Sequence, residues 1–170
     1  MDISTQIPTH VLNHLLNDES FCRRVIPFLK KEYFEGEHRV VFDLIVDFVS
    51  THNKLPTSKI LEIELTGVQA PDDLLNRSSH LITEIKERSD IETEWLIKES
   101  EKWCQEKAIY GAIMDSIQII DGKKPELQAG AIPDILSQAL GVSFDQDIGH
   151  DYIDNSEERY DFYNKVEERI

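Results

Sequence analysis

Residues 91–120 constrain the fold more than any other stretch, because nothing in them stops a helix. They contain no proline, and Gly111 is the only weak helix former among them. A helix of that length extends about 45 Å at about 1.5 Å per residue. A compact chain of 170 residues is only about 40 Å across, from a radius of gyration of about 15 Å. The helix is therefore expected either to traverse the whole domain or to protrude from it.

A second apolar helix is expected to return beside the first. The turn sequence DGKKP at 121–125 follows the long run, and residues 132–140 again show apolar side chains at helical spacing. Together the two helices form an αα-hairpin. A protruding hairpin this rich in isoleucine cannot cover its own apolar surface, so we expect it to pair with another chain. The residues expected at this subunit interface are Ile109, Ile113, Met114, Ile117, Ile120, Ile132, Ile135, Leu136 and Leu140.

The rest of the chain is also patterned as helices, so the expected fold class is all-α. Tyr33 and Phe34 are expected to pack inward, and Trp95, Leu96 and Trp103 suit a core at the start of the long helix. No alternating run is bounded by hairpin turns, so no strand is expected. Apolar spacing predicts helices over residues 5–16, 19–29, 37–52 and 72–88, and a short helix capped by Thr57 or Ser58. The expected organisation is a helical bundle over 1–90, the protruding hairpin over 91–141, a connector over 142–154 and a C-terminal linker helix over 155–170.

The expected linker helix carries an apolar stripe with no partner in the rest of the chain. The region 145–170 holds nine acidic residues against three basic ones, which makes the other side of the helix a solvated face. We expect the stripe to dock on a protein partner, and docking onto the N-terminal bundle of the same chain is the alternative. The stripe consists of Tyr160, Phe162, Tyr163, Val166 and Ile170.

Composition argues against several classes of protein. The net charge is −15, from 33 acidic and 18 basic residues, so the domain is poorly suited to neutralise the phosphates of DNA. No apolar run approaches the roughly 20 residues that span a bilayer. The N-terminus lacks the basic start of a signal peptide, so neither a signal peptide nor a membrane anchor is expected. Cys22 and Cys104 match no metal or disulfide spacing and are expected to be buried thiols in a reducing cytoplasm.

No catalytic, cofactor-binding or metal-binding residue is expected in this chain. It contains no glycine-rich phosphate loop and no nucleophile elbow. His10 and His14 lie one helical turn apart, but no third ligand accompanies them, which favours a pair on the helix surface over a zinc site. His150 and Asp151 have no nucleophile beside them. The basic pairs at 23–24 and 30–31 indicate a solvated helix face, with a small docking patch for an acidic partner as the alternative.

Three stretches resemble one protein family. VLNHLLNDESFCRRVIPFLKKEYFEGEHRVVFDLI at 11–45 is similar to the N-terminal domain of DnaB-type replicative DNA helicases. In that family, a helix ending in LLxD precedes a second short helix, an aromatic pair and an H+xxF motif. WLIKESEK at 95–102 and GAIPDILSQALGVSFDQDIGHDY at 130–152 resemble the helicases of T4-like tailed phages more specifically. The family motifs fall here on Leu15-Leu16-Asn17-Asp18, Tyr33-Phe34, and His38-Arg39 with Phe42.

The resemblance implies the all-helical collar domain and linker of a hexameric ATP-dependent helicase. In that family, hairpins pair between subunits, the linker helix packs on a neighbour's motor domain, and primase and a helicase loader bind the assembly. ATP, Mg²⁺ and single-stranded DNA would then bind a motor domain encoded beyond Ile170, in the host cytoplasm and without a membrane. Two other readings remain at this stage. The first is a free-standing helical adaptor for a replication protein, and the second, less favoured by the charge, is a helical nucleic-acid-binding module.

Overall fold

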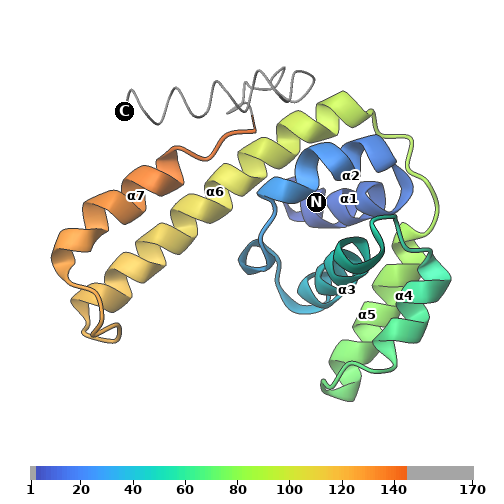
Figure 1. Ribbon diagram of the computed structural model, residues 1–170, viewed down its shortest axis with the longest axis horizontal. Helices are drawn as coiled ribbons and strands as arrows, with labels where there is room; N and C mark the ends of the chain where they lie inside the picture. Colours follow the sequence, from blue (N-terminus) through green and yellow to red (C-terminus); the bar gives the residue numbers. More distant parts are fainter. Residues whose placement is uncertain (1–2, 145–170) are drawn as a thin grey trace.

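The computed structural model describes residues 3–144, and within them the fold is entirely helical (Figure 1). The expected all-α fold class is confirmed. Three short 3-10 turns, η1 (Ile26–Phe28), η2 (Lys31–Tyr33) and η3 (Ala129–Ala131), connect the helices. The α-helices are α1 (Ile3–Asn17), α2 (Glu19–Val25), α3 (Gly36–His52), α4 (Ser58–Leu65), α5 (Asp72–Ile85), α6 (Thr93–Ile120) and α7 (Ile132–Leu140).

The core lies among α1 to α5 and the first half of α6. Phe34 is its aromatic centre, stacking on Phe42 with the ring centroids 4.4 Å apart and meeting the edge of Trp103 at 5.0 Å. Such ring pairs add stability beyond the area that they bury. Tyr33 and Phe34 therefore pack inward as expected. Other fully buried side chains come from every helix of the bundle: Val11, Leu12, Leu15, Phe21, Val25, Val41, Ile45, Leu61, Ile82, Ile85 and Leu96.

Helix ends follow local side-chain chemistry. The Asp18 carboxylate accepts a hydrogen bond from the Phe21 amide at 3.1 Å and so caps α2. The Thr57 hydroxyl accepts from the Ile60 amide at 3.2 Å and caps α4. Asn53 ends α3 in the left-handed conformation, with φ of 54°. The expected helix over 19–29 stops earlier, at Val25, because Pro27 cannot continue it and the chain tightens into η1.

The long helix α6 has two different environments along its length. Leu96, Ser100, Trp103 and Cys104 are buried against the bundle, whereas the second half leaves the bundle and runs beside α7 (Figure 1). The long helix thus both crosses the bundle and protrudes from it. The expectation that Trp95 belongs to the core is wrong, because Trp95 lies on the outer side of the first turn and is exposed.

The linker part of the expected organisation lies outside the described residues. The connector is described only at its start, Val142 to Phe144, and the residues of the expected docking stripe all follow it. The division of the chain at residue 90 stays a prediction. The stripe in question is Tyr160, Phe162, Tyr163, Val166 and Ile170.

Candidate assembly surface on the hairpin

The two helices of the hairpin approach each other through small side chains. Ala112 and Ser116 on α6 and Ala139 on α7 are buried between them, with Ile119 closing the far end. The Ser116 hydroxyl donates to the Ala112 carbonyl at 2.8 Å, so its polar group is satisfied inside the contact. This side of α6 is therefore already covered by α7 and is not available to another chain.

The opposite side of α6 is apolar and uncovered. Tyr110 is 63% exposed, Ile113 47% and Ile120 72%, with Met114 and Ile117 exposed between them. These five residues recur at helical spacing and form one stripe, which we call the α6 stripe. Isolated exposed apolar residues are ordinary, whereas a contiguous exposed stripe is typical of the surfaces through which proteins bind one another.

The structure separates the predicted interface residues into two groups. Ile113, Met114, Ile117, Ile120 and Leu140 are exposed, as an unpaired interface requires. Ile109, Ile132, Ile135 and Leu136 are half-buried within the hairpin itself. The sequence reasoning missed Tyr110 and Leu127, which are exposed on the same hairpin. The helical spacing could have identified Tyr110, because it lies three residues before Ile113 and so on the same side of the helix. The role of these residues as an interface stays a prediction.

The base of the hairpin is tied back to the bundle by the residues that follow α7. The Glu101 carboxylate accepts the Phe144 amide at 2.7 Å and the Ser143 hydroxyl at 3.2 Å. The Gln105 side-chain amide donates to the Val142 carbonyl at 2.9 Å. Phe144 also stacks on Phe28, with the ring centroids 4.7 Å apart. Residues 142–144 therefore hold the end of α7 against the first half of α6.

A second set of contacts fixes the connection between α5 and α6. The Asn13 side-chain amide donates to the carbonyls of Ile85 at 3.3 Å and Glu87 at 2.8 Å, and its oxygen accepts the Ser89 amide at 3.3 Å. Asn17 also donates to the Ile85 carbonyl, at 2.9 Å. We call this set of bonds, made by α1, the α1 clasp. It sets the point from which α6 starts.

Asp18 extends the α1 clasp to the first turn of α6, where its carboxylate accepts the Thr93 hydroxyl at 2.6 Å. Burial acts to raise the pKa of Asp18. The hydrogen bonds from Thr93 and from the Phe21 amide, together with the charges of His14 and Arg88, outweigh it, so the pKa lies below the usual 3.8. The ionised form of Asp18 is therefore the one that the fold favours.

The histidine pair on α1 does not form the surface pair that the sequence suggested. His14 is buried, with Nε2 3.1 Å from the Ile91 carbonyl and its ring edge against Phe21. The interpretation of His14 as a surface residue is wrong, because α1 is buried on more than one side. Within residues 3–144, no group of three or more acidic, histidine or cysteine side chains is arranged to hold a metal ion.

Both cysteines are buried free thiols, as the sequence indicated. Burial raises the pKa of Cys22 to about 11 and that of Cys104 to about 12, the latter with help from the charge of Glu101. The basic residues at 23–24 are exposed and paired with acids: Arg23 with Glu19 at 2.8 Å and Arg24 with Glu94 at 2.5 Å. Their interpretation as a solvated helix face is confirmed.

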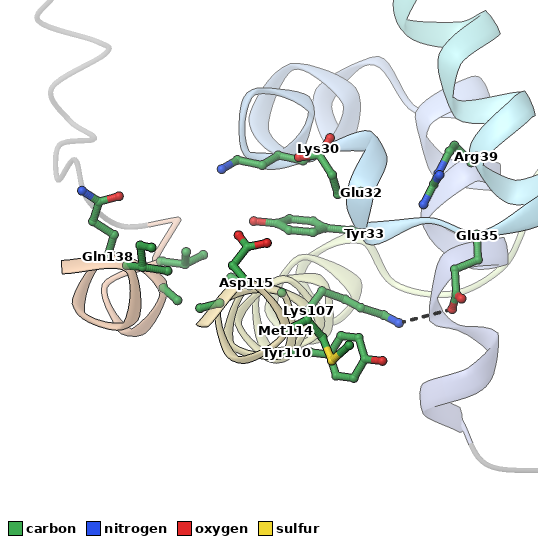
Figure 2. A pocket seen from close by; sticks show the side chains of 16 residues that line it. Lys30, Glu32, Tyr33, Glu35, Arg39, Lys107, Tyr110, Met114, Asp115 and Gln138 are labelled. Atoms are coloured by element: carbon green, nitrogen blue, oxygen red, sulfur yellow. Dashed lines mark ion pairs between the residues drawn. The ribbon is translucent and has the colours of Figure 1, made fainter. Parts of the chain in front are cut away.

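A cleft lies between the bundle and the hairpin, over the middle of α6 (Figure 2). Its volume is about 560 Å³. The η2 segment and α3 line one wall, α7 lines the other, and α6 forms the floor. Lys107 on the floor pairs with Glu35 on the wall at 3.7 Å. The lining includes Tyr110 and Met114, so the cleft opens beside the α6 stripe.

These features define an all-helical domain, in which a bundle carries a hairpin with an apolar stripe that the described residues leave uncovered. Comparison with curated proteins shows which proteins it resembles. Over 166 residues the chain is 32% identical to a DnaB-like replicative helicase of Enterobacteria phage T4. The chain is therefore similar to a DnaB-like replicative helicase over 92% of its length, and the resemblance seen in its motifs is confirmed to that extent.

The chain spans only 35% of the length of that helicase, which is consistent with the N-terminal domain of such a protein. No family model matches the chain. Among residues 3–144, no helix combines the length and the apolar character needed to cross a bilayer.

Proposed function

We propose that this chain is the N-terminal assembly domain of an ATP-dependent, hexameric replicative DNA helicase of a phage. The relationship to a DnaB-like replicative helicase over 92% of the chain supports the helicase part of the proposal. The α6 stripe supports the assembly part, because it is an apolar surface that the described part of the chain leaves uncovered. In this role the domain forms the collar of the ring, and the cytoplasm of the host cell is its location.

Assembly through the α6 stripe is the part that mutation tests most sharply. Ile113→Asp and Ile117→Asp each place a charge in the middle of the stripe, where a partner helix would have to bury it. We expect the chain to associate with itself, and both variants to shift it toward monomer in multi-angle light scattering. Ile63→Asp is the matched control, because Ile63 is 59% exposed on α4, away from the hairpin. Equal association of all four proteins would contradict the proposal.

The chemistry of the helicase belongs, in this proposal, to a motor domain that follows residue 170. That domain would bind ATP, Mg²⁺ and single-stranded DNA, whereas the −15 charge of this chain is poorly suited to DNA. The purified chain is therefore expected to show no ATP turnover. A phosphate-binding loop encoded within the next several dozen codons of the gene supports the helicase. A stop codon there would favour the alternative function, a free-standing helical adaptor for a replication protein.

Primase and a helicase loader are the proposed partners of the assembled collar, and the resemblance to replicative helicases is what supports them. The experiment is a binding titration of the 170-residue chain with the primase and the loader from the same genome. We expect the assembled chain to bind at least one of them. If neither binds the assembled chain, this part of the proposal fails while the assembly role stands.

A further inference from the structure

The cleft over the middle of α6 combines an apolar floor with two cations that lack acidic partners. Ala108 and Met114 belong to the floor, and Ile135 of α7 adds an apolar side chain from one wall. Lys30 and Arg39 line the other wall, which η2 and α3 form (Figure 2). Within residues 3–144, no carboxylate lies at salt-bridge distance from either cation.

The acids that line the cleft do not compensate these two cations. Glu35 pairs with Lys107 at 3.7 Å and Asp115 with Lys124 at 3.1 Å, so both of these carboxylates are already in use. Glu32 is the one lining acid that has no ion pair in the described part of the chain. The unpaired groups of the cleft therefore favour a ligand that brings negative charge, although the net charge of the whole chain is −15.

The chain leaves the described residues at one end of this cleft. Val142 lines the cleft, and Phe144 stacks on Phe28 with the ring centroids 4.7 Å apart. Lys30 comes only two residues after Phe28. The residues that follow Phe144 in the sequence therefore start beside the wall that carries the unpaired cations.

Residues 145–154 have the composition that such a cleft favours. Ten extended residues reach about 33 Å, whereas the floor, from residue 107 to residue 115 of α6, is about 12 Å long. The segment is therefore long enough to cover the whole cleft. It contains no lysine or arginine, its acids are Asp145, Asp147, Asp151 and Asp154, and its large apolar residues are Ile148, Tyr152 and Ile153.

We propose that residues 145–154 bind in the cleft of their own chain, with their acids toward Lys30 and Arg39 and their apolar side chains on the floor. Exposed ion pairs are individually weak, but a short tether raises the effective concentration of the segment to the millimolar range. The contact lies within one chain, so it does not depend on self-association. It sets the point at which residue 155 leaves the bundle, which in the proposed helicase begins the path to the motor domain.

Disulfide exchange within the full 170-residue chain tests the contact. His150→Cys is combined with Gln138→Cys in one variant and with Ser137→Cys in the matched control. Gln138 and Ser137 are exposed neighbours on α7, but Gln138 lines the cleft and Ser137 does not. In a glutathione buffer, the oxidised fraction of the monomer gives the effective concentration of the two introduced thiols. The native thiols are buried and do not compete.

We expect the effective concentration in the Gln138 variant to exceed that in the Ser137 variant at least about fivefold. Equal values would refute the contact, because a segment that does not bind in the cleft reaches both neighbours alike. A disulfide that forms only between two chains would place the segment in the cleft of a second copy and overturn the assignment to its own chain.

The charge of the wall is tested in the same variants. Lys30→Glu should reduce the preference for Gln138 to within about twofold, since it replaces an attraction by a repulsion. Lys31→Glu is the matched control, because Lys31 is an exposed lysine next in the sequence that does not line the cleft, and the preference should persist. A preference that both changes leave intact, or that both abolish equally, would refute the role of Lys30.

Discussion

Replacing Asn13 by alanine should loosen the connection from which the hairpin starts. Asn13 is buried, and its side chain makes three hydrogen bonds to the backbone of residues 85–89, two as a donor and one as an acceptor. Alanine removes all three bonds at once. It leaves the Glu87 carbonyl and the Ser89 amide without their side-chain partner.

The expected loss in the free energy of unfolding follows from those bonds. A protein hydrogen bond contributes about 1 kcal/mol net, and a buried group left without a partner costs about 1–3 kcal/mol. Alanine favours a helix over asparagine by about 0.5 kcal/mol, which offsets part of the loss. Since Ser89 and Glu87 are near the surface, we expect a net loss of about 2–4 kcal/mol. That is a large share of the roughly 5–15 kcal/mol that stabilise a domain.

Urea unfolding followed by far-ultraviolet circular dichroism measures this loss. Asn76→Ala is the matched control, because Asn76 is also within a helix but is exposed, and its side chain makes no hydrogen bond to the described residues. It should change the free energy of unfolding by less than about 0.5 kcal/mol. If the Asn13 and Asn76 variants unfold with free energies within about 0.5 kcal/mol of each other, the α1 clasp does not hold the connection.

Three further outcomes are expected. Because burial raises the pKa of Cys22 to about 11 and of Cys104 to about 12, a thiol-specific reagent at pH 8 should label the chain only after urea unfolding. Labelling of the native chain at the unfolded rate would contradict their burial. The lowered pKa of Asp18 stabilises the fold above its unfolded value of 3.8, and that stability is lost as pH falls through the lower folded value. Asp18→Asn should therefore flatten the dependence of unfolding free energy on pH below about 4, and an unchanged slope would refute the role of that carboxylate. Glu101→Ala removes the acceptor of the Phe144 amide, so hydrogen exchange of that amide should accelerate roughly tenfold or more, whereas an unchanged rate would show that residues 142–144 are held by other contacts.

The sequence predicted the elements whose signal is local. The long helix followed from a run without proline, and its return partner followed from the DGKKP turn. Burial of the cysteines and of the aromatic pair at 33–34 also followed from residue type and spacing. These features depend on neighbouring residues, which is why a single sequence was enough to find them.

The features that could not be predicted from the sequence depend on contacts between residues far apart in the chain. The α1 clasp joins Asn13 to Glu87, and residues 142–144 reach back to Glu101, so no local pattern marks either contact. The α6 helix has apolar residues facing the bundle, α7 and solvent, so periodicity could not say which side Trp95 or Tyr110 would take. His14 was misassigned for the same reason, since α1 is buried on more than one side.

The mass of the unmodified chain in solution tests the central claim most directly. One chain has a mass of 19.7 kDa. The measurement is sedimentation equilibrium over a concentration series reaching tens of micromolar. If the α6 stripe is an assembly surface, the average mass rises with concentration to at least twice the mass of one chain. A constant mass of 19.7 kDa across the series would contradict the account, because the stripe would then remain uncovered in the free domain.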